Sequence, residues 1–378
     1  MQWITCPGLE PGAFQARSLR RSRLKAGTRG VMGRRSVIAL CIALLTGALA
    51  PARAAQPYQA DPKLVAAAKQ EGQVILYTTL IVDQIVRPLI KAFNAQIPGI
   101  EVKFVRGDSA QLMVKLINEG RAGRIQADIW HLSDGVRPLL QENLAATLDL
   151  PNAHGLPAEL VDPKGHWVAT NLSTRSFAYN TQLVAADQVP RTHQALLDPR
   201  WKGQFVWHPN SIAGGYGFIG LVLKSMGEES GMRYLRALAK QNIIPLPIAT
   251  RAVMDRIIAG EYPMGLEMNS SHAVISAAAG APVRFVPLDP VTMTMQIAGL
   301  SHDAPHPNAG KLFLDFMIAR AGQEVFRDAD YIPMRPDVPA KSPEVKPDTG
   351  GYQALMLTPE DMDANNQHWA KVFDDLFR

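Results

Sequence analysis

Small polar residues follow three short apolar runs in the N-terminal half of the chain. The runs are 74–77, 102–105 and 128–130, and the polar residues that come within a few positions of their ends are Thr78, Thr79, Ser109, Ser133 and Asp134. If the runs are parallel strands, their carboxyl ends lie at one edge of a sheet, where open α/β sheets bind ligands. The same side chains are good helix N-caps, which is the alternative role of each. The sequence predicts a polar ligand site at these three strand ends, which we call the corners.

A glycine-rich segment, Ala213-Gly214-Gly215, opens a predicted helix. Exposed backbone N–H groups and the helix dipole favour an anion at such a start, and an ordinary turn is the alternative. Residues 215–220 also match GxGxxG, but a dinucleotide site needs this motif in the first βα turn and an acid about 20 residues later. Here the motif comes deep in the chain, and 234–240 is a basic predicted helix. An exported nicotinamide-dependent oxidoreductase therefore stays only as an alternative of another class.

Two arginines are candidate anion ligands. Thr250 and Arg251 begin a predicted helix, and the planar guanidinium of arginine suits carboxylate and phosphate groups. Arg251 is equally an ordinary exposed helix residue. Arg175 lies among apolar neighbours, where it would form an ion pair between two lobes of the fold or clamp a ligand; the sequence slightly favours the ion pair.

Motifs of catalysis are missing from the sequence. It has no GxSxG elbow, HExxH, GxxxxGK[ST] loop or EF-hand loop. His302 and His306 lie four residues apart, but the prolines on both sides of His306 favour a solvated loop over a metal site. Nothing in the sequence fixes the separation of Asp134 and Glu267, which are the other candidate pair. We expect no enzymatic activity, no cofactor and no bound metal.

The elements that must position these residues alternate between strand-like and helix-like runs. This alternation predicts βαβ units and a parallel sheet. The predicted strands are 74–77, 102–105, 128–130, 166–179, 204–207, 264–268 and 283–286, and the predicted helices are 85–95, 109–119, 216–226, 229–240, 251–259, 271–279, 308–320 and 359–376. We expect two α/β lobes, with approximate bounds 55–149 plus 250–305 for the first and 150–249 plus 306–378 for the second.

The first 54 residues read as an export signal. A basic head at 32–35, an uncharged apolar run at 37–50 and the small residues of Ala52-Arg53-Ala54 are the three parts of a secretory signal peptide. We expect cleavage near Ala54 and a periplasmic location. The pair Arg34-Arg35 leaves twin-arginine export open, and residues 1–31 suggest a start codon placed too far upstream.

Removing this segment changes the charge of the protein. Nine of the 39 Lys and Arg and one of the 34 Asp and Glu lie in 1–54, which leaves 30 bases against 33 acids and a net charge of −3. Both cysteines, Cys6 and Cys41, are also removed. A nucleic-acid partner would need a basic stripe in the folded part, and none is present. Thiol chemistry is likewise excluded from the mature chain.

Several strings between 61 and 338 resemble the periplasmic solute-binding proteins of ferric-iron-type ABC importers. The most specific is Leu197-Asp198-Pro199-Arg200-Trp201-Lys202-Gly203, and the supporting strings are 72–77, 165–168, 177–180 and 331–336. The resemblance implies a two-lobed α/β fold, the type II periplasmic-binding-protein fold, with a hinge and an inter-lobe ligand cleft. It also implies a membrane permease as partner, and we expect a monomer.

The resemblance also bears on the ligand. Ferric members of the family hold iron with an adjacent Tyr-Tyr pair, and the matching positions here are Asn269 and Ser270. Without phenolates the site loses the hard anionic oxygens that suit Fe(III). The family's anion site matches 213–215 and Thr250, so we expect a small organic anion: a phosphate ester, a phosphonate or a carboxylate.

Two further ligands stay open. Ferric iron would need an unusual shell drawn from Tyr77, Tyr216, Asp134 or Glu267. A polyamine would need Asp134, Glu267 and Trp130 to face the cleft.

Overall fold

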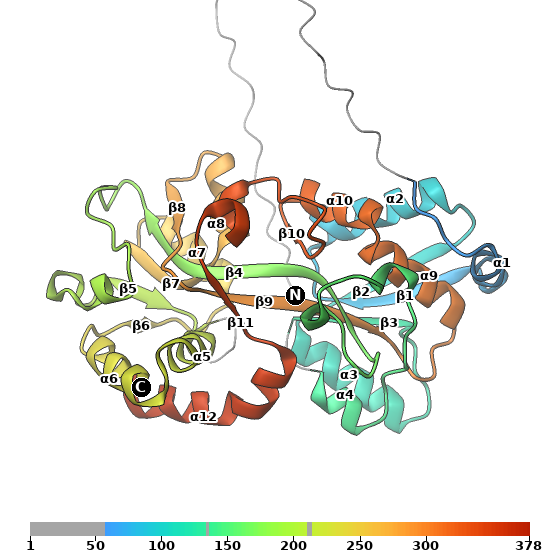
Figure 1. The fold of residues 1–378 in the computed structure, drawn as a ribbon, viewed down its shortest axis with the longest axis horizontal. Coiled ribbons are helices and arrows are strands. Elements are labelled where there is room, and N and C mark those ends of the chain that lie inside the picture. The colour runs from blue at the N-terminus through green and yellow to red at the C-terminus, as the bar shows by residue number, and fades with distance from the viewer. Residues whose placement is uncertain (1–56, 134–135, 210–213) are drawn as a thin grey trace, which may run out of the picture. The chain divides into compact units, whose positions relative to one another are not determined.

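The computed structural model describes residues 57–133, 136–209 and 214–378 (Figure 1). The chain divides into two units, Met1–Ala54 and Ala55–Arg378, and all of the described helices and strands belong to the second. The predicted signal peptide lies outside the described residues, as do Asp134 and Ala213. Within the described ranges, no helix is long and apolar enough to cross a membrane.

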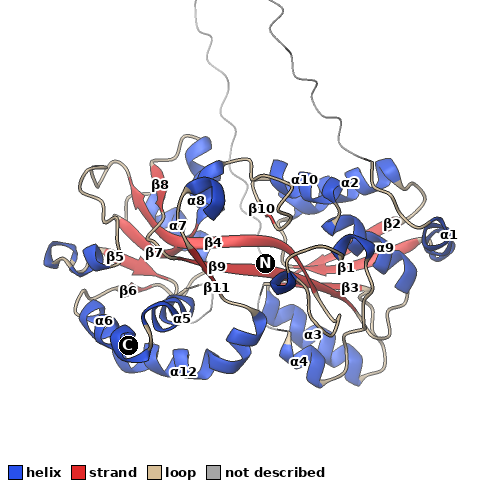
Figure 2. Cartoon of the chain, viewed as in Figure 1, coloured by secondary structure: helices blue, strands red, loops and turns tan. Residues whose placement is uncertain are grey.

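A mixed sheet runs through the described part of the chain (Figure 2), in the order β2-β1-β3-β9-β4-β7-β5-β6. β8 and β10 also pair with β4, and β11 pairs with β9. The strands are β1 (Gln73–Thr78), β2 (Glu101–Arg106), β3 (Ile129–Leu132), β4 (Val168–Asn180), β5 (Phe205–Trp207), β6 (Ile244–Pro245), β7 (Met264–Asn269), β8 (Val283–Val286), β9 (Val291–Leu300), β10 (Ile332–Pro333) and β11 (Ala354–Met356).

Helices flank this sheet, and several begin at side-chain caps that the sequence provides. Asp108 and Gln111 form a capping box at the start of α3, and Thr358 and Asp361 form another at the start of α12. The helices are α1 (Pro62–Glu71), α2 (Arg87–Gln96), α3 (Ser109–Arg121), α4 (Arg137–Gln141), α5 (Gly215–Met226), α6 (Glu228–Ala239), α7 (Thr250–Ile258), α8 (Ser270–Ala278), α9 (Pro307–Ile318), α10 (Arg320–Asp328), α11 (Pro347–Gly350) and α12 (Pro359–Phe377). The predicted elements are confirmed within a few residues of their ends.

The two longest strands, β4 and β9, differ from the predicted parallel sheet. β1 pairs in parallel with β2 and β3 as expected, but β9 is antiparallel to both β3 and β4. β4 is also antiparallel to β7 and β8. The expectation of a parallel sheet was wrong for two reasons: β9 was not recognised as a strand, and β4, which was, runs antiparallel to β7 and β8. In Figure 1 these two strands run side by side across the middle of the second unit.

The hydrophobic side chains gather in separate cores that β4 joins. One core takes residues between 68 and 172 together with residues between 295 and 345, and it includes Leu172 of β4. A second takes residues between 177 and 288 together with 357–377, and it includes Phe177 of the same strand. A smaller third core lies between 178 and 283. This grouping places α9 in the first core and α7 in the third, whereas the predicted lobes assigned them the other way round; the lobe bounds stay a prediction.

Gly299 of β9 is required by the packing of β3. It lies in register with Trp130, and a Cβ atom added to it would lie 2.2 Å from the Trp130 ring and 2.5 Å from the carbonyl oxygen of His166. We expect Gly299→Ala to lower the free energy of unfolding by about 3 kcal/mol, because overpacking forces the backbone to move. Urea denaturation measures this. Gly107→Ala is the control, since the atoms nearest to its Cβ belong to the flexible Leu112 and Gln111 side chains; equal losses in the two variants would contradict the prediction.

Candidate functional site

The three predicted corners come together in space. The hydroxyl oxygens of Thr79 and Ser133 lie 3.1 Å apart, and the backbone N–H of Ser133 donates to Ser109 Oγ at 3.0 Å. Thr78 is fully buried and accepts a hydrogen bond from the N–H of Leu80. Thr79 and Ser133 are partly exposed, so of the four they are the best placed to meet a ligand.

His131 links these corners to β4. It is fully buried, and its Nε2 lies 2.8 Å from the hydroxyl oxygen of Thr170, while Nδ1 lies 3.3 Å from that of Thr78. Burial lowers the pKa of His131 to about 3, so the ring is neutral at physiological pH. The sequence analysis missed this residue, because a histidine inside a short apolar strand carries no distinct pattern.

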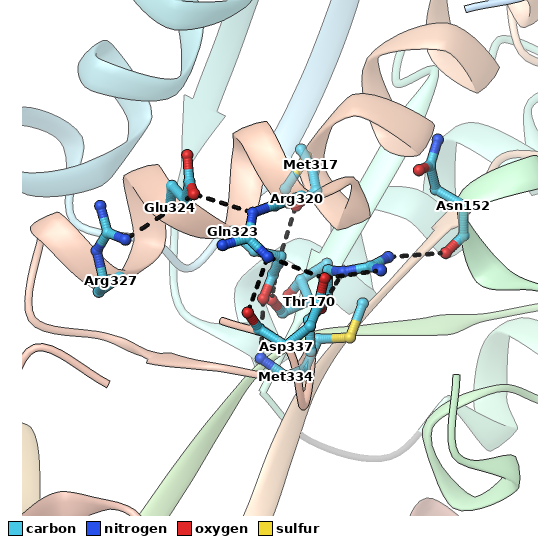
Figure 3. Close-up of polar contacts among 10 residues, drawn as sticks. Asn152, Thr170, Met317, Arg320, Gln323, Glu324, Arg327, Met334 and Asp337 are labelled. Atoms are coloured by element: carbon cyan, nitrogen blue, oxygen red, sulfur yellow. Dashed lines mark hydrogen bonds and ion pairs between the residues drawn. The ribbon is translucent and has the colours of Figure 1, made fainter. Parts of the chain in front are cut away.

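Gln323 of α10 fixes the β4 backbone behind this histidine. Its buried amide nitrogen donates to the carbonyl oxygens of Thr170 and Met317, and its amide oxygen accepts from the N–H of Met334 (Figure 3). Next to it, Arg320 contacts Asp337 and Glu324. The 331–336 string, part of the family resemblance, is therefore a scaffold segment that holds Thr170 in place.

A row of polar side chains lies along one face of β4 and β9. Directly opposed residues of an antiparallel pair point to the same face, and every second residue does so along each strand. The register pairs are Asn171 with Gln296, Ser173 with Thr294, and Arg175 with Thr292. Gln296 Nε2 donates to Ser133 Oγ at 3.1 Å, so the row is continuous with the corner group.

The sequence analysis missed most of this row, although a signal was present. Residues 292–296 read Thr-Met-Thr-Met-Gln and residues 171–175 read Asn-Leu-Ser-Thr-Arg, so polar side chains recur at every second position. A period of two is the mark of a strand with one polar face. Only Arg175 had been singled out.

At its other end the row meets the start of α8. Asn269 lies in register with Arg175 and caps the helix, its Oδ1 accepting from the N–H groups of Ser271 and His272. Ser270 is fully buried, and its hydroxyl oxygen lies 2.7 Å from that of Thr174. Thr174 in turn donates to the carbonyl oxygen of Val345. In this conformation Ser270 therefore holds α8 to β4 and is closed to a ligand.

Three ionisable groups meet beside this helix start. Glu267 is buried with a left-handed backbone (φ 55°), and its Oε1 accepts from Thr292 at 3.0 Å. Burial raises the pKa of Glu267 to about 8, against smaller opposing effects of Arg175 and Thr292. Burial, and then the charges of Arg175 and Arg251, lowers the pKa of His272 to about 4. At neutral pH Glu267 and His272 are thus mainly uncharged, and Arg175 is the charged member of the trio.

Gly214 and Gly215 have a packing role. A Cβ on Gly214 would lie 2.0 Å from the carbonyl oxygen of His208, and one on Gly215 would lie 2.4 Å from the ring of Phe373. Gly220, the last glycine of the GxGxxG match, lies under Trp369 in the same way. Contact with α12 therefore accounts for two of these glycines. The role of 213–215 as an anion site stays a prediction.

Thr250 and Arg251 begin α7, as predicted. Thr250 is partly exposed, whereas Arg251 is exposed and pairs with Asp255 at 2.9 Å. Their role as ligand contacts stays a prediction, and the influence of Arg251 on His272 places this arginine in the electrostatic surroundings of the trio.

Of the residues named for the other ligands, Glu267 lies at the polar row, where it bonds Thr292, whereas Tyr77, Tyr216 and Trp130 have other contacts. Tyr77 is buried and donates to Glu119 Oε1 at 2.8 Å; burial and this hydrogen bond raise its pKa to about 12. Tyr216 packs on Phe373, and Trp130 is fully buried. Tyr77 and Trp130 are therefore not available to iron or a polyamine in this conformation. Across the described ranges, no three His, Cys, Asp or Glu side chains are grouped to hold a metal.

Comparison with known proteins identifies the family. Residues 88–352, more than half of the chain, match the family described as bacterial extracellular solute-binding protein. This chain is a member of that family. The solute-binding protein is 23% identical over 270 residues to the Fe(3+)-binding periplasmic protein of Serratia marcescens, covering 69% of this chain and 78% of the relative.

Solved structures share the fold of this solute-binding protein. Iron-bound HitA from Pseudomonas aeruginosa superposes with a TM-score of 0.67 at 24% identity, over 80% of this chain and 99% of HitA. AfuA from Actinobacillus pleuropneumoniae, with exogenous fructose-6-phosphate bound, has a TM-score of 0.66 at 18% identity, over 81% of this chain and 98% of AfuA. The predicted α/β type II periplasmic-binding fold and the family resemblance are confirmed.

Proposed function

We propose that the protein is the periplasmic substrate-binding component of an ABC importer and delivers a small organic anion to a membrane permease. The ligand classes are those expected from the sequence: a phosphate ester, a phosphonate or a carboxylate. Membership in the solute-binding family supports the binding role. The phosphate ester in the AfuA structure supports this class of ligand for the fold.

The polar row on β4 and β9 is the observation that carries the proposal. It ends at Arg175, beside the N-terminus of α8, where the helix dipole favours negative charge. The guanidinium of Arg175 suits a two-pronged contact with a carboxylate or phosphate. Around it Glu267 and His272 are mainly neutral at pH 7, so the local charge at this end of the row is positive.

The position of the row also suggests how ligand binding would change the conformation that the permease recognises. β4 passes from the first hydrophobic core at Leu172 to the second at Phe177, and residues 173–176 between them are all polar. A ligand seated there would contact both sides of this crossing. We infer that ligand binding favours a closed arrangement of the two lobes, as hinge-closing binding proteins require.

Ferric iron is the second candidate ligand, because one relative is named an Fe(3+)-binding protein and the HitA structure is described as iron-bound. The family resemblance matches Asn269 and Ser270 to the positions of the tyrosines in its ferric members, and neither side chain offers a phenolate. An iron complex with an organic chelator would supply its own anionic oxygens. It belongs in the same screen as the anions.

A thermal-shift screen of the purified protein, refolded to remove carried-over ligand, tests the proposal. We expect a selective rise in Tm with one class among phosphate esters, phosphonates and carboxylates, because ligand at 100 times its Kd stabilises the folded state by about 2.7 kcal/mol. Polyamines, nicotinamide cofactors and ferric citrate complete the panel. A shift with ferric citrate alone would show that the ligand is iron and not an organic anion. A shift with a polyamine alone would show that the ligand is a cation.

A further inference from the structure

Asn171, which is buried, and Gln296, which is partly buried, face each other across β4 and β9, and each keeps one buried polar atom without a hydrogen-bond partner among the described residues. These atoms are Nδ2 of Asn171 and Oε1 of Gln296, which lie on directly paired residues. The other atom of each amide is engaged: Asn171 Oδ1 accepts from Thr170 at 3.2 Å, and Gln296 Nε2 donates to Ser133 at 3.1 Å. Buried polar groups in folded proteins almost always have partners, so this pair calls for one.

The two atoms are complementary to a hydroxyl group. Asn171 offers a donor and Gln296 offers an acceptor, and a hydroxyl both donates and accepts. An anionic oxygen would satisfy only the donor, and an ammonium group only the acceptor. The hydroxyl groups of Thr79 and Ser133, which are partly exposed, extend the same neutral character to the end of the row.

Arg175 lies at the opposite end of this row. It is four residues from Asn171 on the same strand, which corresponds to about 13 Å between their Cα atoms. Ser173 and Thr294 lie between the two ends, on the same face. The row is thus positive at the Arg175 end and neutral, with donors and acceptors, at the Asn171 end.

We propose that the site is bipartite and that its ligand is an anion with a hydroxylated body, in which Arg175 binds the anionic group while Asn171 and Gln296 bind a hydroxyl group. The proposal rests on the anion-binding function given above and narrows its ligand to polyhydroxylated phosphates or acids. Asn171 and Gln296 are then specificity-determining residues. They separate hydroxylated anions from apolar anions of the same charge.

Matched ligands test this by isothermal titration calorimetry. The pairs are fructose 6-phosphate against hexyl phosphate and gluconate against hexanoate, so charge is kept within each pair while the hydroxyl groups change. We expect the protein to bind the hydroxylated member of at least one pair more than about tenfold tighter, because a site built to hydrogen-bond a hydroxyl rejects the analogue that lacks it.

Variants then assign the preference to the two amides. Gln296→Met keeps the length of the side chain and removes both polar atoms, so the preference should fall to below about threefold. Asn171→Leu, close in shape, should act in the same direction if Gln296→Met fails to fold, and circular dichroism checks the fold of both. Gln126→Met, an exposed position after α3, is the matched control and should retain the preference.

Two outcomes would overturn the inference, and they are distinguishable. If anions bind but both members of each pair bind equally, or if the preference survives in Gln296→Met, the bipartite site is wrong and a buried water is the partner of the two amides. If none of the four ligands binds and no anion of the thermal-shift screen raises the Tm, the organic-anion function itself fails, and the bipartite site with it.

Discussion

Replacing Arg175 by glutamine should weaken binding of the anionic ligand by about 100-fold or more. A bidentate contact between a guanidinium and a desolvated anion is a strong charge-assisted interaction, and removing one partner leaves the other charge buried and unpaired. The anion selected by the thermal-shift screen serves as the probe, and isothermal titration calorimetry gives the Kd. Arg175→Lys should recover part of the loss, since lysine keeps the charge but not the planar fork.

Arg256→Gln is the matched control for this loss. Arg256 is an exposed arginine of α7 that pairs with Glu261, and within the described part of the chain it forms no hydrogen bond or ion pair with the polar row. Its substitution should change the Kd by less than about twofold, the effect of a screened surface charge. Equal losses in the two variants would mean that net charge, and not a contact at Arg175, attracts the ligand.

Replacing Glu267 by glutamine should change how the stability of the ligand-free protein depends on pH. The pKa of Glu267 is about 8 in the folded protein, above the 4.5 of a free glutamate side chain. Below pH 4.5 the carboxyl is protonated in both the folded and the unfolded state. As the pH rises from 4.5 to 8, unfolding releases a proton, so the wild-type protein loses stability, by several kcal/mol in total. Above pH 8 this loss levels off.

The glutamine variant lacks this titration, so its stability relative to the wild type should rise between pH 4.5 and 8 and then stay constant. Urea denaturation at pH 5, 6, 7, 8 and 9 measures the difference. Glu261→Gln, at an exposed carboxylate paired with Arg256, is the control and should follow the wild-type profile. A constant difference between Glu267→Gln and wild type across this range would place the pKa of Glu267 outside it.

Much of the fold could be predicted because its signals are local. The apolar runs of β1 and β3 and the helical spacing of α3 and α12 are visible in short windows, and the residues after the strands do form one corner. β9 was not predicted because alternating threonine and methionine residues differ less in hydropathy than alternating charged and aliphatic residues do. Strand direction also has no local signal, so the antiparallel pairing of β4 with β7 and β8 could not be predicted even though all three strands were.

The candidate site was harder to predict because it depends on register. The paired residues are Asn171 with Gln296 and Arg175 with Thr292. The two members of each pair are more than 100 residues apart in the sequence, and no local pattern predicts which residues pair. Residue type also does not tell which face a side chain takes. The Tyr77 side chain bonds Glu119, whereas that of its neighbour Thr78 lies next to His131. Ser270 is buried against Thr174.

The crossing of β4 and β9 constrains how this protein can evolve. Residues 173–176 lie where β4 passes from one hydrophobic core to the other, and two of them, Ser173 and Arg175, belong to the polar row. In the site that we propose, a substitution there would alter ligand selectivity and the mechanical coupling of the cores at the same time. Lineages that adopt new ligands should therefore keep these strand positions and diversify the start of α7, where the exposed Arg251 can change without disturbing the crossing.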